Sequence, residues 1–203
     1  MIEYKGHTIR IKQDFDTQDP LAEFDVASQF WFFHGHYNLG SQKPVGERDF
    51  AEWSEVEAYI RREFKPVAMF PVSMLDHSGL WLRRGIGFAE DLGGWDSGQI
   101  GFAFISRQTV LKEYSCRRIG KRIQARAANL LQAEFEMYAK YVEGDVWGYV
   151  VAGPACNDSC WGFYGYDYCL KEAEQAIDYA LENDPEWLAL AEATVGPVGY
   201  AYV

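Results

Sequence analysis

The sequence predicts an α+β fold, in which a largely antiparallel sheet packs with one long helix and two to three shorter helices. Two pairs of strand-like segments, within residues 1–12 and 145–164, are separated by short turns that contain Gly or Pro, which favours hairpins. Strand and helix patterns do not alternate regularly along the chain, as they would in a parallel α/β sheet. A chain of 203 residues can bury a sizeable core without disulfides, so we expect a single domain over residues 1–203.

The first part of the chain is expected to be mainly strand and loop. Ile2–Tyr4 and Thr8–Lys12 alternate around a Lys5-Gly6 turn, and an acidic, turn-rich segment follows. Together they predict an N-terminal hairpin and acidic loop over residues 1–26. The aromatic run at 27–37 indicates a strand, and the Gly- and Asn-rich segment at 38–47 indicates a loop.

The middle of the chain contains the first predicted helix and the central strands. Apolar residues recur at helical spacing over residues 49–63, which predicts a helix. The strongly apolar segment at 67–75 predicts a central strand, although it contains Pro71. A turn, a short apolar segment and a Gly-rich loop then fill residues 76–94 and lead to a strand at 99–105.

The last part is expected to hold the long helix and a second hairpin. Ser106 is placed to cap a short helix, and an amphipathic pattern over 119–142 predicts a long helix that ends at Gly144. Two strands at 145–152 and 159–164 form the second hairpin. A further amphipathic helix is predicted at 168–182, and a last short helix begins a C-terminal extension over 184–203.

The composition favours an acidic protein with a basic partner. The formal net charge is −11 and the isoelectric point is about 4.8. Such a chain repels nucleic acid over most of its surface and attracts basic partners, including a protein surface that normally holds nucleic acid; plain solubility is the alternative explanation. No apolar run reaches the roughly 20 residues of a membrane span, and the N-terminal residues contain no apolar signal region, so we expect a cytoplasmic protein.

The charge is uneven, because a basic block is formed by Arg107, Lys112, Arg117, Arg118, Lys121, Arg122 and Arg126. Arg118, Arg122 and Arg126 recur at four-residue steps and so share one helix face. Arginine binds phosphate bidentately, so this block could bind nucleic acid directly. The alternatives are pairing with the chain's own carboxylates and a solvated helix face.

Two Asp-Ser turns each lead into a Gly- and aromatic-rich strand, in the segments W-D-S-G at 95–98 and D-S-C-W-G at 158–162. Aspartate in such turns accepts backbone N–H groups two residues on, so Asp96 and Asp158 are interpreted as turn-forming residues. The aromatic side chains beside them are typical interface anchors and would also suit a homodimer. The predicted partner-binding residues are Trp95, Asp96, Asp158, Trp161, Tyr164, Arg118 and Arg122.

The histidines raise the question of a metal site. His34 and His36 are two residues apart, so on a strand both would point to one face. With Asp76 and His77 they supply the residue types of a facial metal site, and histidines bonded to backbone are the other explanation. We expect no bound metal or cofactor. The alternative is a metal-dependent enzyme that acts on nucleotides or nucleic acid through His34, His36, Asp76 and His77.

Several motifs together resemble those of a family of small proteins encoded by bacteriophages and mobile elements. They are H-G-H-Y-N-L-G (34–40), M-L-D-H-S-G (74–79), W-D-S-G-Q-I-G-F (95–102), Y-A-K-Y-V-E-G-D-V-W-G-Y (138–149) and D-S-C-W-G-F-Y-G (158–165). The resemblance covers roughly residues 30–170 and assigns no catalytic residues.

The resemblance implies a setting more than a mechanism. Small phage accessory proteins often inhibit host defence, including CRISPR effectors and restriction enzymes. We therefore expect a protein-binding inhibitor of a bacterial defence effector, which occupies a basic nucleic-acid-binding surface or blocks a conformational change. Its expected partner is a host defence protein or its nucleoprotein complex, and a nucleic-acid-binding accessory protein is a further alternative.

Overall fold

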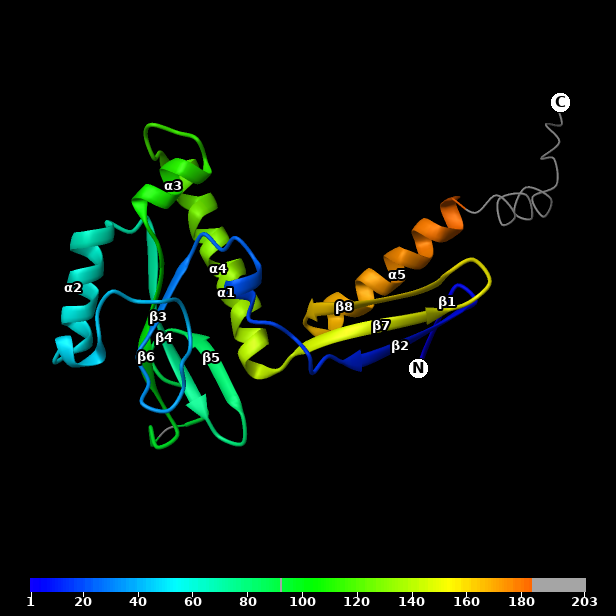
Figure 1. Cartoon of the computed structure of the whole chain (residues 1–203), viewed down its shortest axis with the longest axis horizontal. Helices are drawn as coiled ribbons and strands as arrows, with labels where there is room; N and C mark the ends of the chain where they lie inside the picture. Colours follow the sequence, from blue (N-terminus) through cyan, green and yellow to red (C-terminus); the bar gives the residue numbers. More distant parts are fainter. Residues whose placement is uncertain (92, 184–203) are drawn as a thin grey trace, which may run out of the picture. The chain divides into compact units, whose positions relative to one another are not determined.

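The computed structural model describes residues 1–91 and 93–183 of the chain, so the predicted helix and extension over 184–203 lie outside the described residues. The α+β fold class is confirmed, because the described residues form helices and two antiparallel sheets (Figure 1). The chain divides into two compact units. We call residues 18–144 the central unit, and residues 1–17 with those from 145 onward the terminal unit. The prediction of a single domain over residues 1–203 stays a prediction.

The central unit is built on a four-stranded antiparallel sheet with the strand order β3-β6-β4-β5. Its strands are β3 (Gln29–Phe32), β4 (Ala68–Asp76), β5 (Leu80–Arg84) and β6 (Ser97–Ile105). The predicted strands at 67–75 and 99–105 are therefore present. The central strand β6 pairs with β3 on one side and with β4 on the other.

Two helices cover the two faces of this sheet. The long helix α4 (Lys121–Glu143) packs on one face, and α2 (Trp53–Phe64) packs on the other (Figure 1). The alternation of β3 explains this arrangement, because Phe30 and Phe32 point to the α4 side whereas Trp31 and Phe33 point to the α2 side. The part of the aromatic run that forms β3 is thus a strand that is buried on both faces.

Short elements and caps complete the central unit. They are α1 (Pro20–Glu23), the 3₁₀ helix η1 (Glu47–Asp49) and α3 (Arg107–Glu113). Ser106 caps α3 as expected, since its side-chain oxygen accepts the N–H of Thr109 at 3.0 Å. Gly144 ends α4 as expected with a left-handed φ of 72°.

The terminal unit has its own sheet and its own core. The strand order is β1-β2-β7-β8, from β1 (Ile2–Tyr4), β2 (His7–Gln13), β7 (Val146–Ala152) and β8 (Asn157–Tyr164). Helix α5 (Tyr166–Asn183) packs on one face through Cys169, Ala173 and Ile177. Both predicted hairpins are confirmed, and the first one turns at Lys5-Gly6 with positive φ angles at both residues.

One predicted strand is much shorter than expected. The aromatic run at 27–37 forms strand only over Gln29–Phe32, and the chain turns after Phe33. The prediction that His34 and His36 share one face of a strand is therefore wrong. Instead, Nδ1 of His34 accepts the N–H groups of His36 and Tyr37, each at 3.3 Å, which closes a local turn.

No helix within residues 1–91 and 93–183 combines the length and the hydropathy that a bilayer crossing requires.

Candidate functional site

Strands β4 and β6 bring two polar loops together at one end of the central sheet. Leu75 pairs with Ser97 in the register, so the turn after β4 lies beside the loop before β6. The backbone N–H of Asp76 donates to the carbonyl of Asp96 at 2.8 Å and extends this pairing by one bond. Residues that are about twenty positions apart in the sequence therefore lie side by side at one end of the sheet.

Asp91 organises the loop that precedes β6. Its carboxylate accepts the backbone N–H groups of Trp95 at 3.2 Å and of Asp96 at 3.0 Å. Hydrogen bonds from the Ser97 side chain and from these backbone groups hold the pKa of Asp91 below its ordinary value. The sequence predicts that Asp96 accepts backbone N–H groups two residues further on. The N–H groups of Trp95 and of Asp96 itself are accepted by the carboxylate of Asp91, a residue that sequence reasoning did not single out.

The carboxylate of Asp96 has a different partner, the side chain of His77. Nδ1 of His77 and Oδ2 of Asp96 are 2.9 Å apart, with side chains that are 71% and 48% exposed. The neighbouring Asp76 accepts a hydrogen bond from the hydroxyl of Tyr37 at 2.9 Å, which raises the pKa of Tyr37. Two carboxylates are thus held at the surface by one neighbour each.

These carboxylates line a polar pocket of about 460 Å³. Its wall includes Asp76 and Asp96 together with His34, Trp53 and Trp95. The side chain of Trp95 is 90% exposed, which is unusual for so large an apolar group. The pocket therefore combines acidic groups with an aromatic side chain that is available for contact.

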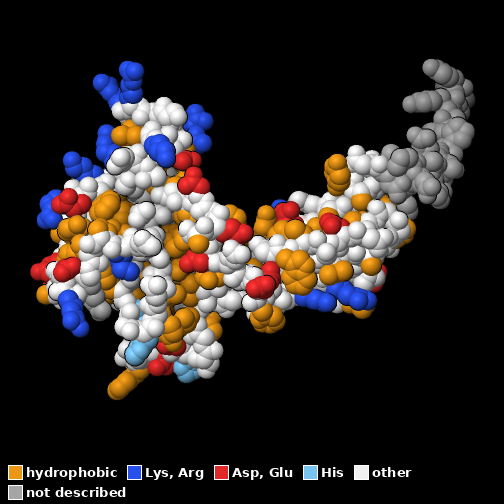
Figure 2. Space-filling view, viewed as in Figure 1, with side chains coloured by type: hydrophobic (Ala, Val, Ile, Leu, Met, Phe, Trp, Pro, Cys, Tyr) orange, Lys and Arg blue, Asp and Glu red, His pale blue; other side chains and the backbone are white. Residues whose placement is uncertain are grey.

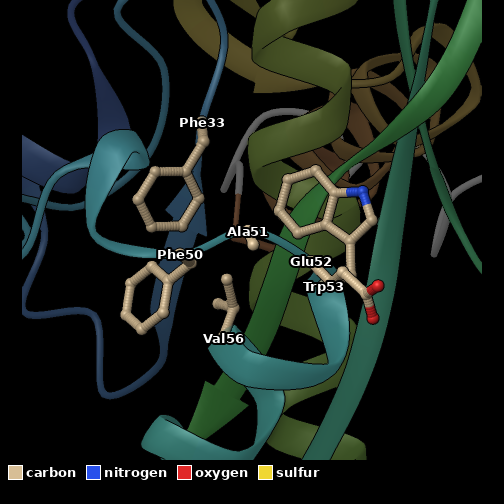
Figure 3. Close-up of a pocket in the computed structure, with 6 residues that line it drawn as sticks. All are labelled: Phe33, Phe50, Ala51, Glu52, Trp53 and Val56. Atoms are coloured by element: carbon tan, nitrogen blue, oxygen red, sulfur yellow. The ribbon is translucent and has the colours of Figure 1, made fainter.

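A second, smaller pocket adjoins the first and is mainly aromatic. It has a volume of about 220 Å³ and is lined by Phe33, Phe50, Ala51, Glu52, Trp53 and Val56. Figure 3 shows the rings of Phe33 and Phe50 on one side and the indole of Trp53 on the other. Phe33 and Trp53 also line the polar pocket, so the two pockets are neighbours that share part of their lining. We call Phe33, Phe50, Trp53, Asp76, Trp95 and Asp96 the acidic-aromatic surface.

The structure does not support the alternative of a metal site at His34, His36, Asp76 and His77. Within residues 1–91 and 93–183, no group of three or more His, Cys, Asp or Glu side chains could hold a metal ion. The physical reason is that these side chains are directed elsewhere. His34 accepts backbone N–H groups, Asp76 binds Tyr37, and His77 binds Asp96.

Three of the predicted partner-binding residues belong to the terminal unit. Asp158 accepts the N–H of Ser159 at 2.8 Å and the hydroxyl of Tyr149 at 3.0 Å, so it shapes the start of β8. Trp161 is 47% exposed and lies over Gly148, where an added Cβ would fall 2.2 Å from the indole. Tyr164 is half-buried near the end of β8. These residues and Trp95 lie in different units, and the interpretation of all three as contacts stays a prediction.

The other two predicted contacts, Arg118 and Arg122, are exposed in the central unit. Arg122 lies in the first turn of α4, and Arg118 lies in the segment that leads into it. They belong to a separate basic region and do not line either pocket of the acidic-aromatic surface.

Neither the aromatic pocket nor the role of Asp91 was predicted from the sequence. Phe33 and Trp53 lie in segments that were interpreted only as strand and helix, and their meeting depends on tertiary packing of α2 on β3. For Asp91 a signal did exist, because an aspartate followed by Gly93-Gly94 is typical of a capped turn.

Comparisons with protein-family models, with curated proteins and with solved structures gave no match.

Proposed function

We propose that this protein acts by binding another protein, as an inhibitor of a bacterial defence effector, and that it makes this contact through the acidic-aromatic surface. The observation that carries the proposal is the adjacency of the two pockets, which share Phe33 and Trp53, beside an almost fully exposed Trp95. Exposed tryptophan within a concave surface is typical of the centre of a protein interface.

The chemistry of this surface suits a basic partner. Asp76 and Asp96 offer carboxylate oxygens to arginine or lysine side chains, and arginine pairs with carboxylates in a bidentate geometry. The aromatic rings of Phe50 and Trp53, which are partly exposed, supply faces for the same cations and for apolar anchors. Complementary charge increases the association rate and the specificity of such a contact.

The class of partner follows from the charge of the chain and from the phage-protein resemblance of its motifs. A net charge of −11 favours association with a basic channel that normally holds nucleic acid. Defence effectors of bacteria possess such channels, and a protein that occupies one would exclude the nucleic acid. On this proposal the protein acts in the cytoplasm of the bacterial host.

The experiment is a pull-down with the tagged full chain from bacterial lysates that carry diverse defence systems, with and without nuclease treatment. A defence protein that is retained in stoichiometric amount after nuclease treatment supports the proposal. If no defence protein is retained, and if expression of the chain gives phages no protection, the proposal is wrong.

A second candidate function is metal-independent acid–base catalysis on nucleotides or nucleic acid. The observation that favours it is the His77–Asp96 pair at 2.9 Å, in which a carboxylate orients an imidazole. Turnover of nucleotides or nucleic acid by the purified chain, lost in His77→Ala, would support this candidate over the binding role.

A further inference from the structure

A dense group of cations covers the α3 end of the central unit. Residues 107–126 contain seven Lys or Arg residues and one acidic residue, Glu113. All seven cations are exposed, and they are Arg107, Lys112, Arg117, Arg118, Lys121, Arg122 and Arg126. Figure 2 shows Lys and Arg side chains gathered around α3 and the start of α4. We call these seven residues the basic cluster.

The basic cluster has no internal neutralisation. Within the part of the chain that the structure describes, none of the seven side chains forms an ion pair. Some cations elsewhere are paired, as Arg61 is with Glu57 and Arg83 is with Glu90. The described residues therefore give no support to the explanation that the basic block pairs with carboxylates of its own chain.

The cluster is also unfavourable for the helix that carries part of it. The first turn of α4 contains no acidic residue, and Lys121 and Arg122 occupy the end at which the helix dipole is positive. Cations at a helix N-terminus reduce helix stability. Among the described residues, neither helix stability nor ion pairing accounts for this arrangement, which suits a surface for an external anion.

The members of the cluster are drawn together by contacts within the unit. The guanidinium of Arg126 lies over the ring of Tyr114, 4.8 Å from its centroid, which brings α4 against the end of α3. Lys65 adjoins the cluster, because Lys65 and Arg107 line the same pocket of about 390 Å³, whose acidic member Glu63 is paired with Arg62. The positive charge thus continues from the end of α2 across α3 to the start of α4.

The basic cluster and the acidic-aromatic surface lie at opposite ends of β6. Trp95 and Asp96 directly precede this strand, and Arg107 follows it. A strand of nine residues spans about 30 Å, several times the screening length of roughly 8 Å at physiological salt. The carboxylates at one end therefore do not cancel the field of the cations at the other end.

We propose that the basic cluster binds the phosphate backbone of nucleic acid. A phosphodiester chain presents closely spaced negative charges that several arginine and lysine side chains can neutralise together. Arginine in particular matches phosphate oxygens in a bidentate geometry. This inference does not depend on the proposed function, because it concerns a different surface and a different class of ligand.

The test is direct binding of the purified full chain to fluorescent DNA and RNA duplexes of mixed sequence, measured by anisotropy over a series of salt concentrations. Neutralising n phosphates gives a logarithmic salt slope of about −0.9n for duplex DNA, so engagement of four or more cations predicts a slope of about −3.6 or steeper. The double variant Arg118→Gln/Arg122→Gln should reduce the slope by about 2 and the affinity at least about 10-fold at low salt.

The matched control is Arg61→Gln/Arg62→Gln, which removes the same charge from cations that are already paired on α2. It should leave the slope and the affinity close to those of the unchanged protein. The inference is overturned if neither duplex binds at about 50 mM salt. It is also overturned if Arg118→Gln/Arg122→Gln and Arg61→Gln/Arg62→Gln bind the duplexes with the same affinity and the same salt slope. Failure of the defence-protein pull-down with intact duplex binding would count against the proposed function alone.

Discussion

Nδ1 of His77 lies 2.9 Å from Oδ2 of Asp96, and this contact joins the turn after β4 to the loop before β6. The backbone bond from the N–H of Asp76 to the carbonyl of Asp96 supports the same junction. Both side chains of the pair remain exposed, so the junction can be reached by a partner. The loop that presents Trp95 is therefore fixed from two directions, by Asp91 on its own side and by the β4 turn on the other.

The first prediction concerns Asp91 as a positioning residue for Trp95. Replacing it in Asp91→Ala removes the acceptor for the N–H groups of Trp95 and Asp96, so their amides should exchange with solvent faster. Hydrogen exchange measured by NMR or mass spectrometry checks this. Asp49→Ala is the control, since Asp49 is another exposed aspartate that caps a backbone N–H, that of Gly46 at 2.7 Å. If residues 95–97 exchange equally fast in both variants, the assigned role of Asp91 is wrong.

The second prediction concerns pH. The folded state holds the pKa of Asp91 below its ordinary value of 3.8, so the unfolded chain takes up this proton first as the pH falls. The stability that Asp91 contributes is present above pH 3.8 and is lost as the pH falls through the lower folded pKa. The difference in unfolding free energy between the unchanged protein and Asp91→Asn should shrink below that pH. A difference that stays constant from neutral pH to the acid limit would contradict this.

The third prediction compares two glycines of β6. At Gly101, φ is 157° and an added Cβ would lie 1.9 Å from the carbonyl oxygen of Trp31, so Gly101→Ala forces β3 and β6 apart. We expect a loss of about 2 kcal/mol or more in unfolding free energy. Gly98 in the same strand has open space at that position, and Gly98→Ala should change stability by less than about 1 kcal/mol. Chemical denaturation measures the unfolding free energy of both variants. Equal losses of unfolding free energy would contradict the close approach of Gly101 to the carbonyl oxygen of Trp31.

The fourth prediction concerns the cost of the basic cluster to α4. Lys121→Glu places a negative charge in a first turn that has no acidic residue and should raise the unfolding free energy by about 0.3–1 kcal/mol. Lys140→Glu, in the last turn of the same helix, should lower it. Thermal denaturation at low salt checks the signs. Destabilisation by Lys121→Glu would mean that Lys121 makes a favourable contact in the folded protein.

The sequence predicts the helices and strands of this fold better than it predicts the tertiary contacts between them. Local signals were sufficient for the Lys5-Gly6 hairpin and for the Ser106 cap, because each depends on residues that are close in the chain. The end of β3 after Phe32 was not predictable from an aromatic run that continues to Tyr37. Hydrophobic pattern alone does not say where an apolar segment leaves the sheet.

The same limit applies to the candidate site. Asp96 and Trp95 were predicted from local turn chemistry, but the partner of Asp96 proved to be His77 of another loop, which only the pairing of β4 with β6 brings near. The four residues of the metal alternative are not brought around one centre, for a related reason. Ligand types can be read from a sequence, whereas the hydrogen bonds that direct each side chain away from a common centre cannot.

The most direct test of the central claim is a quantitative pull-down that compares the unchanged chain with Trp95→Ala and with Phe15→Ala. Both substitutions remove a highly exposed aromatic side chain, and Phe15 belongs to the terminal unit and lines neither pocket. The proposal predicts that Trp95→Ala reduces retention of a defence protein at least about 10-fold, as expected for an interface anchor worth more than 1 kcal/mol, and that Phe15→Ala leaves it unchanged. Retention that is equal in all three chains would contradict the assignment of the acidic-aromatic surface as the contact.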